Sequence, residues 1–88
     1  HPHLPRVLGV CLEKDHPAIV FDLIEGWNLG EFLVGVGGKL QYTCFVLHCA
    51  IQVASALCFL HEKGIVHRDV ALRYAVPVAV SCILLLLF

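Results

Sequence analysis

Charge of either sign is scarce in this chain, and neither sign is in clear excess. Of the 88 residues, 15% are charged, and the formal net charge is −1. The chain therefore lacks the basic field that attracts nucleic acid and the acidic field that attracts a cationic partner. We expect no nucleic-acid partner.

Paired cysteines are also missing. The five cysteines are odd in number, and no two of them form a C-x-x-C pair. This pattern argues against a disulfide framework or a zinc site and favours reduced thiols, as in the cytosol. Six histidines leave a small metal-binding or redox module as a hypothesis that rests on counts alone. Because His16, His48, His61 and His67 fall in different expected elements, we expect no metal site.

A signal peptide is absent as well, because no charged region followed by an apolar core opens the sequence. What the chain has in abundance is apolar residues, at 59% with a mean hydropathy of +0.85. A soluble domain has about 45–50%. Its length supports one small domain with a modest core. We interpret the chain as a piece of a larger domain, with surfaces that pack against further segments.

The first half of the chain predicts a hairpin and a short helix. Residues 7–12 and 18–25 have the pattern of short buried strands around a polar turn. One interrupted helix is the alternative, but Gly9 and Pro17 would both lie inside it. Residues 29–33 have the length of one or two helical turns. The glycines of residues 35–38 lack the G-x-G-x-x-G spacing and context of a phosphate-binding loop, so we expect a plain connector.

Residues 41–63 have a helical apolar pattern that ends at Gly64, which suits the left-handed position after a helix. Apolar residues recur at steps of four and three along this segment, and further apolar residues make the helix apolar well beyond one stripe. This is typical of a helix buried in a larger lobe. The stripe consists of Val46, Ala50, Val53, Leu57 and Leu60.

The segment after this helix contains His67-Arg68-Asp69, which resembles the catalytic-loop signature of protein kinases, H-R-D-L-x-x-x-N. In that signature the Asp accepts the proton of the substrate hydroxyl, and the Asn holds a second magnesium ion. Tyr74 stands at the Asn position.

Other segments resemble the same family in the same order. Residues 1–4 are similar to the H-P-N-I segment that enters the fourth strand, and residues 8–12 resemble the L-G-V-C strand of tyrosine kinases. Residues 19–26 resemble the fifth strand and hinge, and the two expected helices match those that follow. The resemblance covers residues 1–73. It implies an α+β fold class: a fragment of the bilobal protein kinase fold, plus an unrelated apolar tail over residues 74–88.

The resemblance assigns the adenine site to the hinge. Phe21 occupies the gatekeeper position at the back of the adenine pocket. The backbone of Asp22 and Ile24 would bond to the adenine of ATP, with Leu23 between them. An extended segment presents its N–H and C=O groups to a flat heterocycle, so the identity of these side chains matters little.

The resemblance also assigns catalytic roles. Asp69 would be the proton acceptor that orients the hydroxyl, His67 would pack in the core of the lobe, and Arg68 would pair with a phosphate on an activation loop. Ala71 and Arg73 match the pattern of tyrosine kinases rather than that of serine/threonine kinases. The resemblance therefore favours the tyrosine or tyrosine-kinase-like branch.

The family activity implied is transfer of the γ-phosphate of ATP to a protein hydroxyl, with ATP and Mg²⁺ as cofactors and a protein as substrate. The sequence has no glycine-rich phosphate loop, no strand-three Lys with its helix Glu, no D-F-G motif and no activation loop. Since phosphoryl transfer depends on positioned cations, we expect this chain to be inactive alone and to bind its cofactors poorly.

The tail from Tyr74 to Phe88 is apolar and does not resemble a kinase segment. As a helix it would be about 22 Å long, too short for a hydrocarbon core of about 30 Å. It is a product of truncation or mis-splicing, a hydrophobic end that packs on the lobe, or a stub of a membrane anchor. The alternative function is a non-catalytic kinase-like protein that binds partners or membrane through its hinge region and tail. We expect a location in the cytoplasm or on the cytoplasmic side of a membrane.

Overall fold

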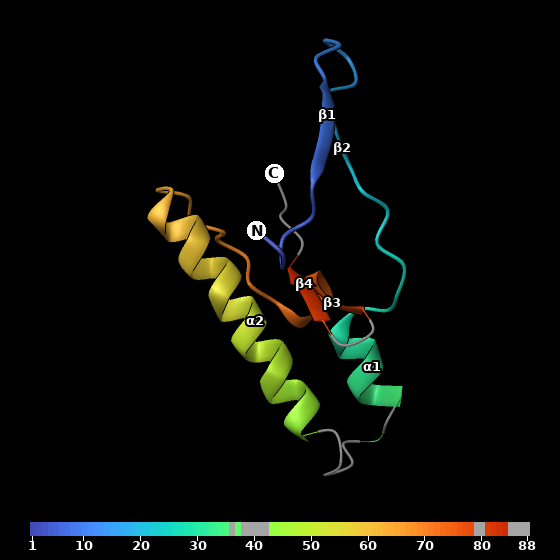
Figure 1. Ribbon diagram of the computed structural model, residues 1–88. Helices are drawn as coiled ribbons and strands as arrows, with labels where there is room; N and C mark the ends of the chain where they lie inside the picture. The colour runs from blue at the N-terminus through green and yellow to red at the C-terminus, as the bar shows by residue number, and fades with distance from the viewer. Residues whose placement is uncertain (36, 38–42, 79–80, 85–88) are drawn as a thin grey trace.

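The computed structural model describes residues 1–35, 37, 43–78 and 81–84, and it has an α+β fold (Figure 1). It contains two antiparallel hairpins, each of which forms its own two-stranded sheet; the second hairpin packs against the two helices and the first projects away from them. The elements follow in the order β1 (Val7–Cys11), β2 (Ala18–Phe21), α1 (Leu29–Gly35), α2 (Thr43–Glu62), the short 3-10 turn η2 (Leu72–Tyr74), β3 (Ala75–Val78) and β4 (Ser81–Leu84).

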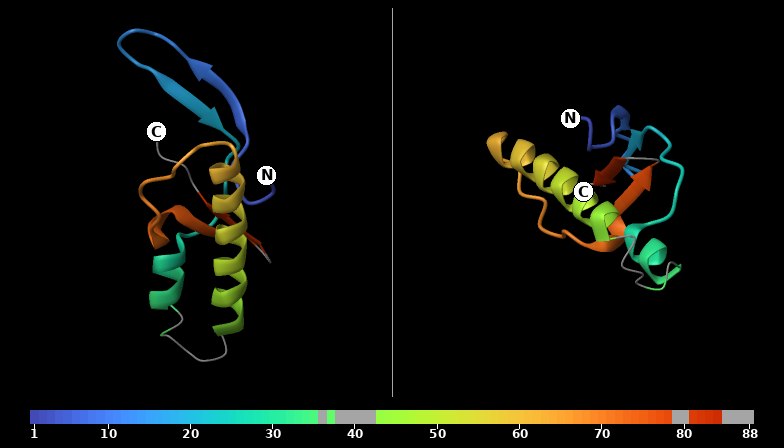
Figure 2. Two further views of the ribbon diagram at one scale, coloured as in Figure 1. Left: turned by 90° about the vertical axis from the view of Figure 1, so that its left-hand side faces the viewer. Right: turned by 60° about the horizontal axis from the view of Figure 1, so that its bottom comes forward.

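The predicted first hairpin is present, but it differs from the prediction in burial and length. β1 pairs antiparallel with β2, with Val7 opposite Phe21 and a bulge between Val7 and Gly9. The hairpin projects away from the helices (Figures 1 and 2), so apolar residues such as Val10 remain 61% exposed. The expected burial is therefore wrong for this chain. The second strand also ends at Phe21 and not at residue 25, because the chain then leaves the ladder toward α1.

The helix α1 begins where the sequence predicts a short helix. Asn28 caps it, since its Oδ1 accepts the Glu31 N–H at 2.9 Å. Leu29 is buried at the start of the helix and forms a core cluster with Cys49 of α2 and Ala75 of β3. Around this cluster pack four half-buried side chains: Phe32, Leu33, Phe45 and Val53.

The predicted long helix is present as α2, and the predicted stripe is confirmed in part, because its last residue, Leu60, is buried. Cys49, Ala56 and Leu60 are buried, whereas Ala50 is exposed. The apolar residues surround this helix, so their spacing does not select one face. By length and composition α2 is also long and apolar enough to cross a membrane, a property that core helices of soluble proteins share.

The tail forms strands where the structure describes it. β3 pairs with β4, with Ala75 opposite Leu84 and Pro77 opposite Cys82. Residues 75–78 and 81–84 are therefore extended and not helical. β4 packs against α2 and β3 against α1, as both views in Figure 2 show. The start of the tail thus contributes to the core.

The predicted connector before α2 includes residues 36 and 38, which lie outside the described residues.

Gly30 allows α1 to approach the turn η2 closely. A Cβ at Gly30 would lie 3.2 Å from Asn28 Oδ1 and 3.7 Å from Leu72 Cβ, whereas a Cβ at Gly35 of the same helix would meet nothing within 4 Å. Replacing a helical glycine by alanine gains up to about 1 kcal/mol in helix propensity. At Gly30 this gain is offset by crowding of the cap.

We therefore expect Gly35→Ala to raise the free energy of unfolding. The free energy of unfolding of Gly30→Ala should be about 1 kcal/mol lower than that of Gly35→Ala. Urea denaturation of the two variants, followed by circular dichroism, measures the difference. An equal increase in the free energy of unfolding of both variants would show that Gly30 does not pack closely against Asn28 and Leu72.

Candidate active site

The loop that carries the predicted catalytic residues begins at a well-formed helix end. Gly64 has a φ of 72°. Its N–H donates to the carbonyl of His61, and the Ile65 N–H donates to the carbonyl of Leu60, both at 2.9 Å. This pair of bonds is the Schellman motif, in which glycine takes the left-handed position at no steric cost. The motif reverses the chain, and residues 65–71 return alongside α2 (Figure 1).

His67 and Asp69 are joined within this loop. His67 is buried, at 8% exposure. Its Nδ1 accepts the backbone N–H of Asp69 at 3.2 Å, so Nδ1 carries no proton in this arrangement. Between them, Arg68 adopts a φ of 69°. The left-handed region is unfavourable for a residue with a Cβ, and Arg68 occupies it where the chain folds the Asp69 amide back onto the imidazole.

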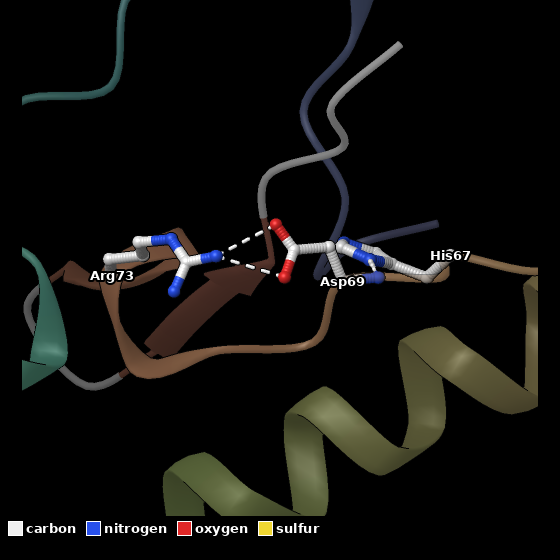
Figure 3. A network of polar contacts seen from close by, with 3 residues as sticks. All are labelled: His67, Asp69 and Arg73. Atoms are coloured by element: carbon white, nitrogen blue, oxygen red, sulfur yellow. Dashed lines mark hydrogen bonds and ion pairs between the residues drawn. The ribbon is translucent and has the colours of Figure 1, made fainter.

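Arg73 holds the side chain of Asp69 from the other direction. The Nη2 of Arg73 donates to both carboxylate oxygens of Asp69, at 2.9 Å to Oδ1 and 2.8 Å to Oδ2 (Figure 3). The turn η2 makes this contact possible, since the Tyr74 N–H donates to the carbonyl of Ala71 at 3.0 Å. The Asp69 and Arg73 side chains are 49% and 57% exposed, so water screens the pair and its effect is to orient the carboxylate.

Tyr74 contacts the same guanidinium. The carbon centre of the Arg73 guanidinium lies 4.5 Å from the centroid of the Tyr74 ring, a cation–π distance. A side-chain hydrogen bond with Tyr74, and then one with Asp69, raises the pKa of Arg73 above its ordinary value. Arg73 is thus a permanent cation between the ring and the carboxylate. Sequence reasoning treated Tyr74 only as the loss of a metal ligand; an aromatic residue beside an arginine was the signal for this contact.

The predicted hinge is fixed at its first residue. Arg6 Nε and Nη2 donate to the two carboxylate oxygens of Asp22, at 3.0 and 3.2 Å. The Asp22 N–H donates to the carbonyl of Arg6 at 3.1 Å. This hydrogen-bonded pair, with its Coulomb attraction, raises the pKa of Arg6 above its ordinary value. Sequence reasoning missed Arg6, although opposite charges at the facing ends of two predicted strands were a usable signal.

The remaining hinge residues differ in exposure. Phe21 and Ile24 are half-buried, and Leu23 is 87% exposed. The Asp22 N–H already donates to the Arg6 carbonyl. The backbone group of Asp22 that could bond to an adenine base is therefore its carbonyl oxygen, which accepts. His67, Asp69 and Arg73 therefore form one network, and Phe21 to Ile24 form a separate segment on the other side of β3 and β4 (Figure 1).

An apolar cavity lies beside the catalytic loop, between α1, α2 and residues 70–75. It has a volume of about 390 Å³. Its lining is apolar throughout and includes Leu29, Cys49, Val53, Leu57, Val70 and Leu72. The cavity shows that α2 and the loop enclose space that their own side chains do not fill.

The side chains of Asp69, Arg73 and Tyr74 do not form a suitable magnesium site. Mg²⁺ prefers several oxygen ligands in octahedral geometry. Here a guanidinium cation contacts both oxygens of the carboxylate, and Tyr74 offers a ring instead of an amide oxygen. Over the described ranges, no group of three His, Cys, Asp or Glu side chains could hold a metal ion.

Comparison with known proteins agrees with the resemblance. Residues 1–77 match the family model described as protein tyrosine and serine/threonine kinase. The tyrosine-protein kinase Abl of Drosophila melanogaster is 32% identical over 73 residues, which cover 83% of this chain and 4% of that protein. The tyrosine-protein kinase transforming protein Abl of Abelson murine leukemia virus has the same identity and chain coverage, with 10% of its own length covered.

A plant protein is similar to the same part of the chain. The putative U-box domain-containing protein 53 of Arabidopsis thaliana is 42% identical over 73 residues, covering 78% of this chain and 9% of that protein. The chain thus spans a tenth or less of the length of these three relatives.

The left-handed backbone at Arg68 gives a test of the loop geometry. Glycine adopts this φ without a steric penalty, whereas a β-branched residue is a clear outlier there. We expect Arg68→Gly to leave the free energy of unfolding unchanged or raise it by up to about 1 kcal/mol, and Arg68→Val to lower it by about 1–2 kcal/mol.

Thermal and urea denaturation of the two variants measure this difference, with Arg68→Ala as the reference for loss of the side chain. If valine were tolerated as well as glycine, the loop would not hold Arg68 in the left-handed region.

Proposed function

Because the chain belongs to the protein tyrosine and serine/threonine kinase family, as a tyrosine-kinase-like member, we propose that it provides the hinge and the catalytic loop of an ATP-dependent protein kinase. Residues 21–24 receive the adenine base, and Asp69 accepts the proton of a protein hydroxyl, that of tyrosine. The chain spans a small share of its relatives, so this activity is proposed for a longer protein that contains these residues.

The observation that carries the proposal is the two-sided fixation of Asp69. Its backbone N–H is bound to the His67 ring, and its carboxylate is bound to Arg73. A proton acceptor must be held within hydrogen-bond reach of its donor, and a fixed carboxylate costs little reorganisation when the substrate arrives. About half of the Asp69 side chain is exposed, which leaves room for an incoming hydroxyl.

Arg73 acts through Asp69 in this proposal. It orients the carboxylate by binding both of its oxygens. His67 holds the loop backbone from the buried side. ATP supplies the transferable phosphate when it is bound. No step is assigned to a metal ion, because the Asp69 and Tyr74 positions do not suit one.

The hinge part of the proposal is tested by removing one backbone donor. Proline lacks an N–H and is tolerated in extended connectors. We expect Ile24→Pro to lower the affinity for ATP about fivefold to tenfold, the value of one hydrogen bond to the base. Leu23→Pro, which removes the neighbouring N–H, is the matched control and should change the affinity less than twofold.

Amide chemical shifts of the ¹⁵N-labelled chain, titrated with ATP, provide the measurement. Shifts confined to residues 22–24 support the hinge assignment. Shifts that are absent there, or an equal effect of both proline variants, contradict it.

We further expect no phosphoryl transfer by the 88-residue chain alone. Its sequence has no strand-three Lys and no D-F-G Asp, and Arg73 lies on the carboxylate beside the position where the family signature has Asn. These charged groups and metal ions supply most of the rate enhancement in phosphoryl transfer.

The assay uses radiolabelled ATP, Mg²⁺ and a tyrosine-containing peptide, with Asp69→Asn as the paired variant. The expected result is the same background in both. Transfer above background that disappears in Asp69→Asn would contradict the expected inactivity and would itself establish Asp69 as the proton acceptor.

A further inference from the structure

An unusually exposed tryptophan precedes α1. Trp27 is 72% exposed, although tryptophan has one of the largest apolar surfaces of any residue. It lies in the connector between the hinge and the Asn28 cap. A large aromatic side chain left in water at a fixed position marks a contact surface when other groups of suitable chemistry adjoin it.

Such groups adjoin Trp27. A hollow of about 370 Å³ is lined, within the part of the chain that the structure describes, by Trp27, Glu31, Phe32 and Gly35. The carboxylate of Glu31 is exposed and is the one charged group in this lining. Gly35 has no side chain, and the space where a Cβ would stand is open. The hollow is therefore mainly apolar, with one acidic side chain in its lining.

The walls of the hollow are held in place by the helix start. The Glu31 N–H is bound to Asn28 Oδ1 at 2.9 Å, and the Phe32 N–H donates to the Asn28 carbonyl at 3.0 Å. The Phe32 ring packs against Phe45 of α2, with ring centroids 5.2 Å apart. Asn28 thus fixes the backbone that carries Glu31 and Phe32, next to Trp27 in the sequence. A site built in this way loses little entropy when it binds a ligand.

We propose that this hollow binds the side chain of an arginine in a basic segment of a partner protein. A guanidinium is attracted to the face of an indole ring, where cation–π contacts are strongest. The Glu31 carboxylate complements its charge, and the aliphatic stem of the arginine covers the Phe32 ring. The proposal goes beyond the kinase assignment, because it uses neither the hinge backbone nor the Asp69 network.

Trp27 is the only tryptophan of the chain, so its fluorescence reports on this hollow alone. The probe is a nine-residue peptide of glycine and serine with one central arginine, titrated into the 88-residue chain at millimolar concentration. The control peptide carries citrulline, which has the shape of arginine without its charge. We expect a saturable change in Trp27 fluorescence with the arginine peptide and an affinity for the citrulline peptide at least tenfold lower.

Variants separate the two contributions. Glu31→Gln should weaken binding of the arginine peptide about threefold to fivefold. Glu13→Gln makes the same change of net charge in the distant hairpin turn and should change binding less than twofold. Trp27→Leu should weaken it about tenfold, read from the amide chemical shifts around Glu31 in the ¹⁵N-labelled chain. Because Trp27 and Glu31 are exposed, circular dichroism should show unchanged folding.

Equal binding of the two peptides, no saturable binding of either, or equal effects of Glu31→Gln and Glu13→Gln would each overturn the proposal. So would a blue shift of Trp27 fluorescence with neutral phosphatidylcholine vesicles but not with the arginine peptide, since that result assigns the surface to lipid. None of these outcomes affects the hinge assignment, which is read from the amide signals of residues 22–24.

Discussion

The contact between Leu29, Cys49 and Ala75 is the constraint on which the rest of the structure depends. It joins the start of α1, the middle of α2 and the start of β3. The loop of residues 65–74 lies between the end of α2, where Gly64 fixes its entry, and the core residue Ala75, which fixes its exit. A chain of ten residues held at both ends has few ways to place its side chains. The pairing of Asp69 with Arg73 follows from this closure, since η2 turns Arg73 back just before the chain enters the core.

The elements that the sequence predicts well are those with a local cause. Gly64 ends α2 because glycine alone takes its backbone conformation freely, and the break at residues 26–28 separates the hairpin from α1. The buried face of α2 could not be predicted, because apolar residues lie all round the helix and burial depends on what packs there. The strands of the first hairpin were expected to be buried for their composition, yet no described element covers them. The tail gave no periodicity, so its strands could not be told from a helix.

The resemblance of residues 67–69 to a catalytic-loop signature was visible in the sequence, but the contacts of these residues were not. A signature specifies residue types at a spacing, and it says nothing about which atoms meet. The left-handed backbone of Arg68 and the bond from the Asp69 amide to His67 exist only because the loop closes between its anchors. Tyr74 illustrates the same limit. Where the signature has Asn, the sequence shows a missing oxygen ligand, whereas the structure shows a ring that holds the Arg73 cation beside Asp69. Tyr74 therefore provides a ring that contacts the Arg73 guanidinium, at the position where the signature has the Asn that holds a metal ion.

The composition of α2 allows two environments, and its contacts within the described residues fit one of them. A helix of 20 residues is about 30 Å long, which matches a hydrocarbon core as well as the interior of a lobe. In a membrane, however, Cys49 and Leu60 would have to leave the side chains that bury them, and the Schellman turn at Gly64 would have to release the loop that it positions. The apolar cavity beside α2 and the exposed Leu47 and Ile51 fit a lobe helix with uncovered sides. Membership in the kinase family fits the same environment, because the family match spans residues 1–77 and so includes α2.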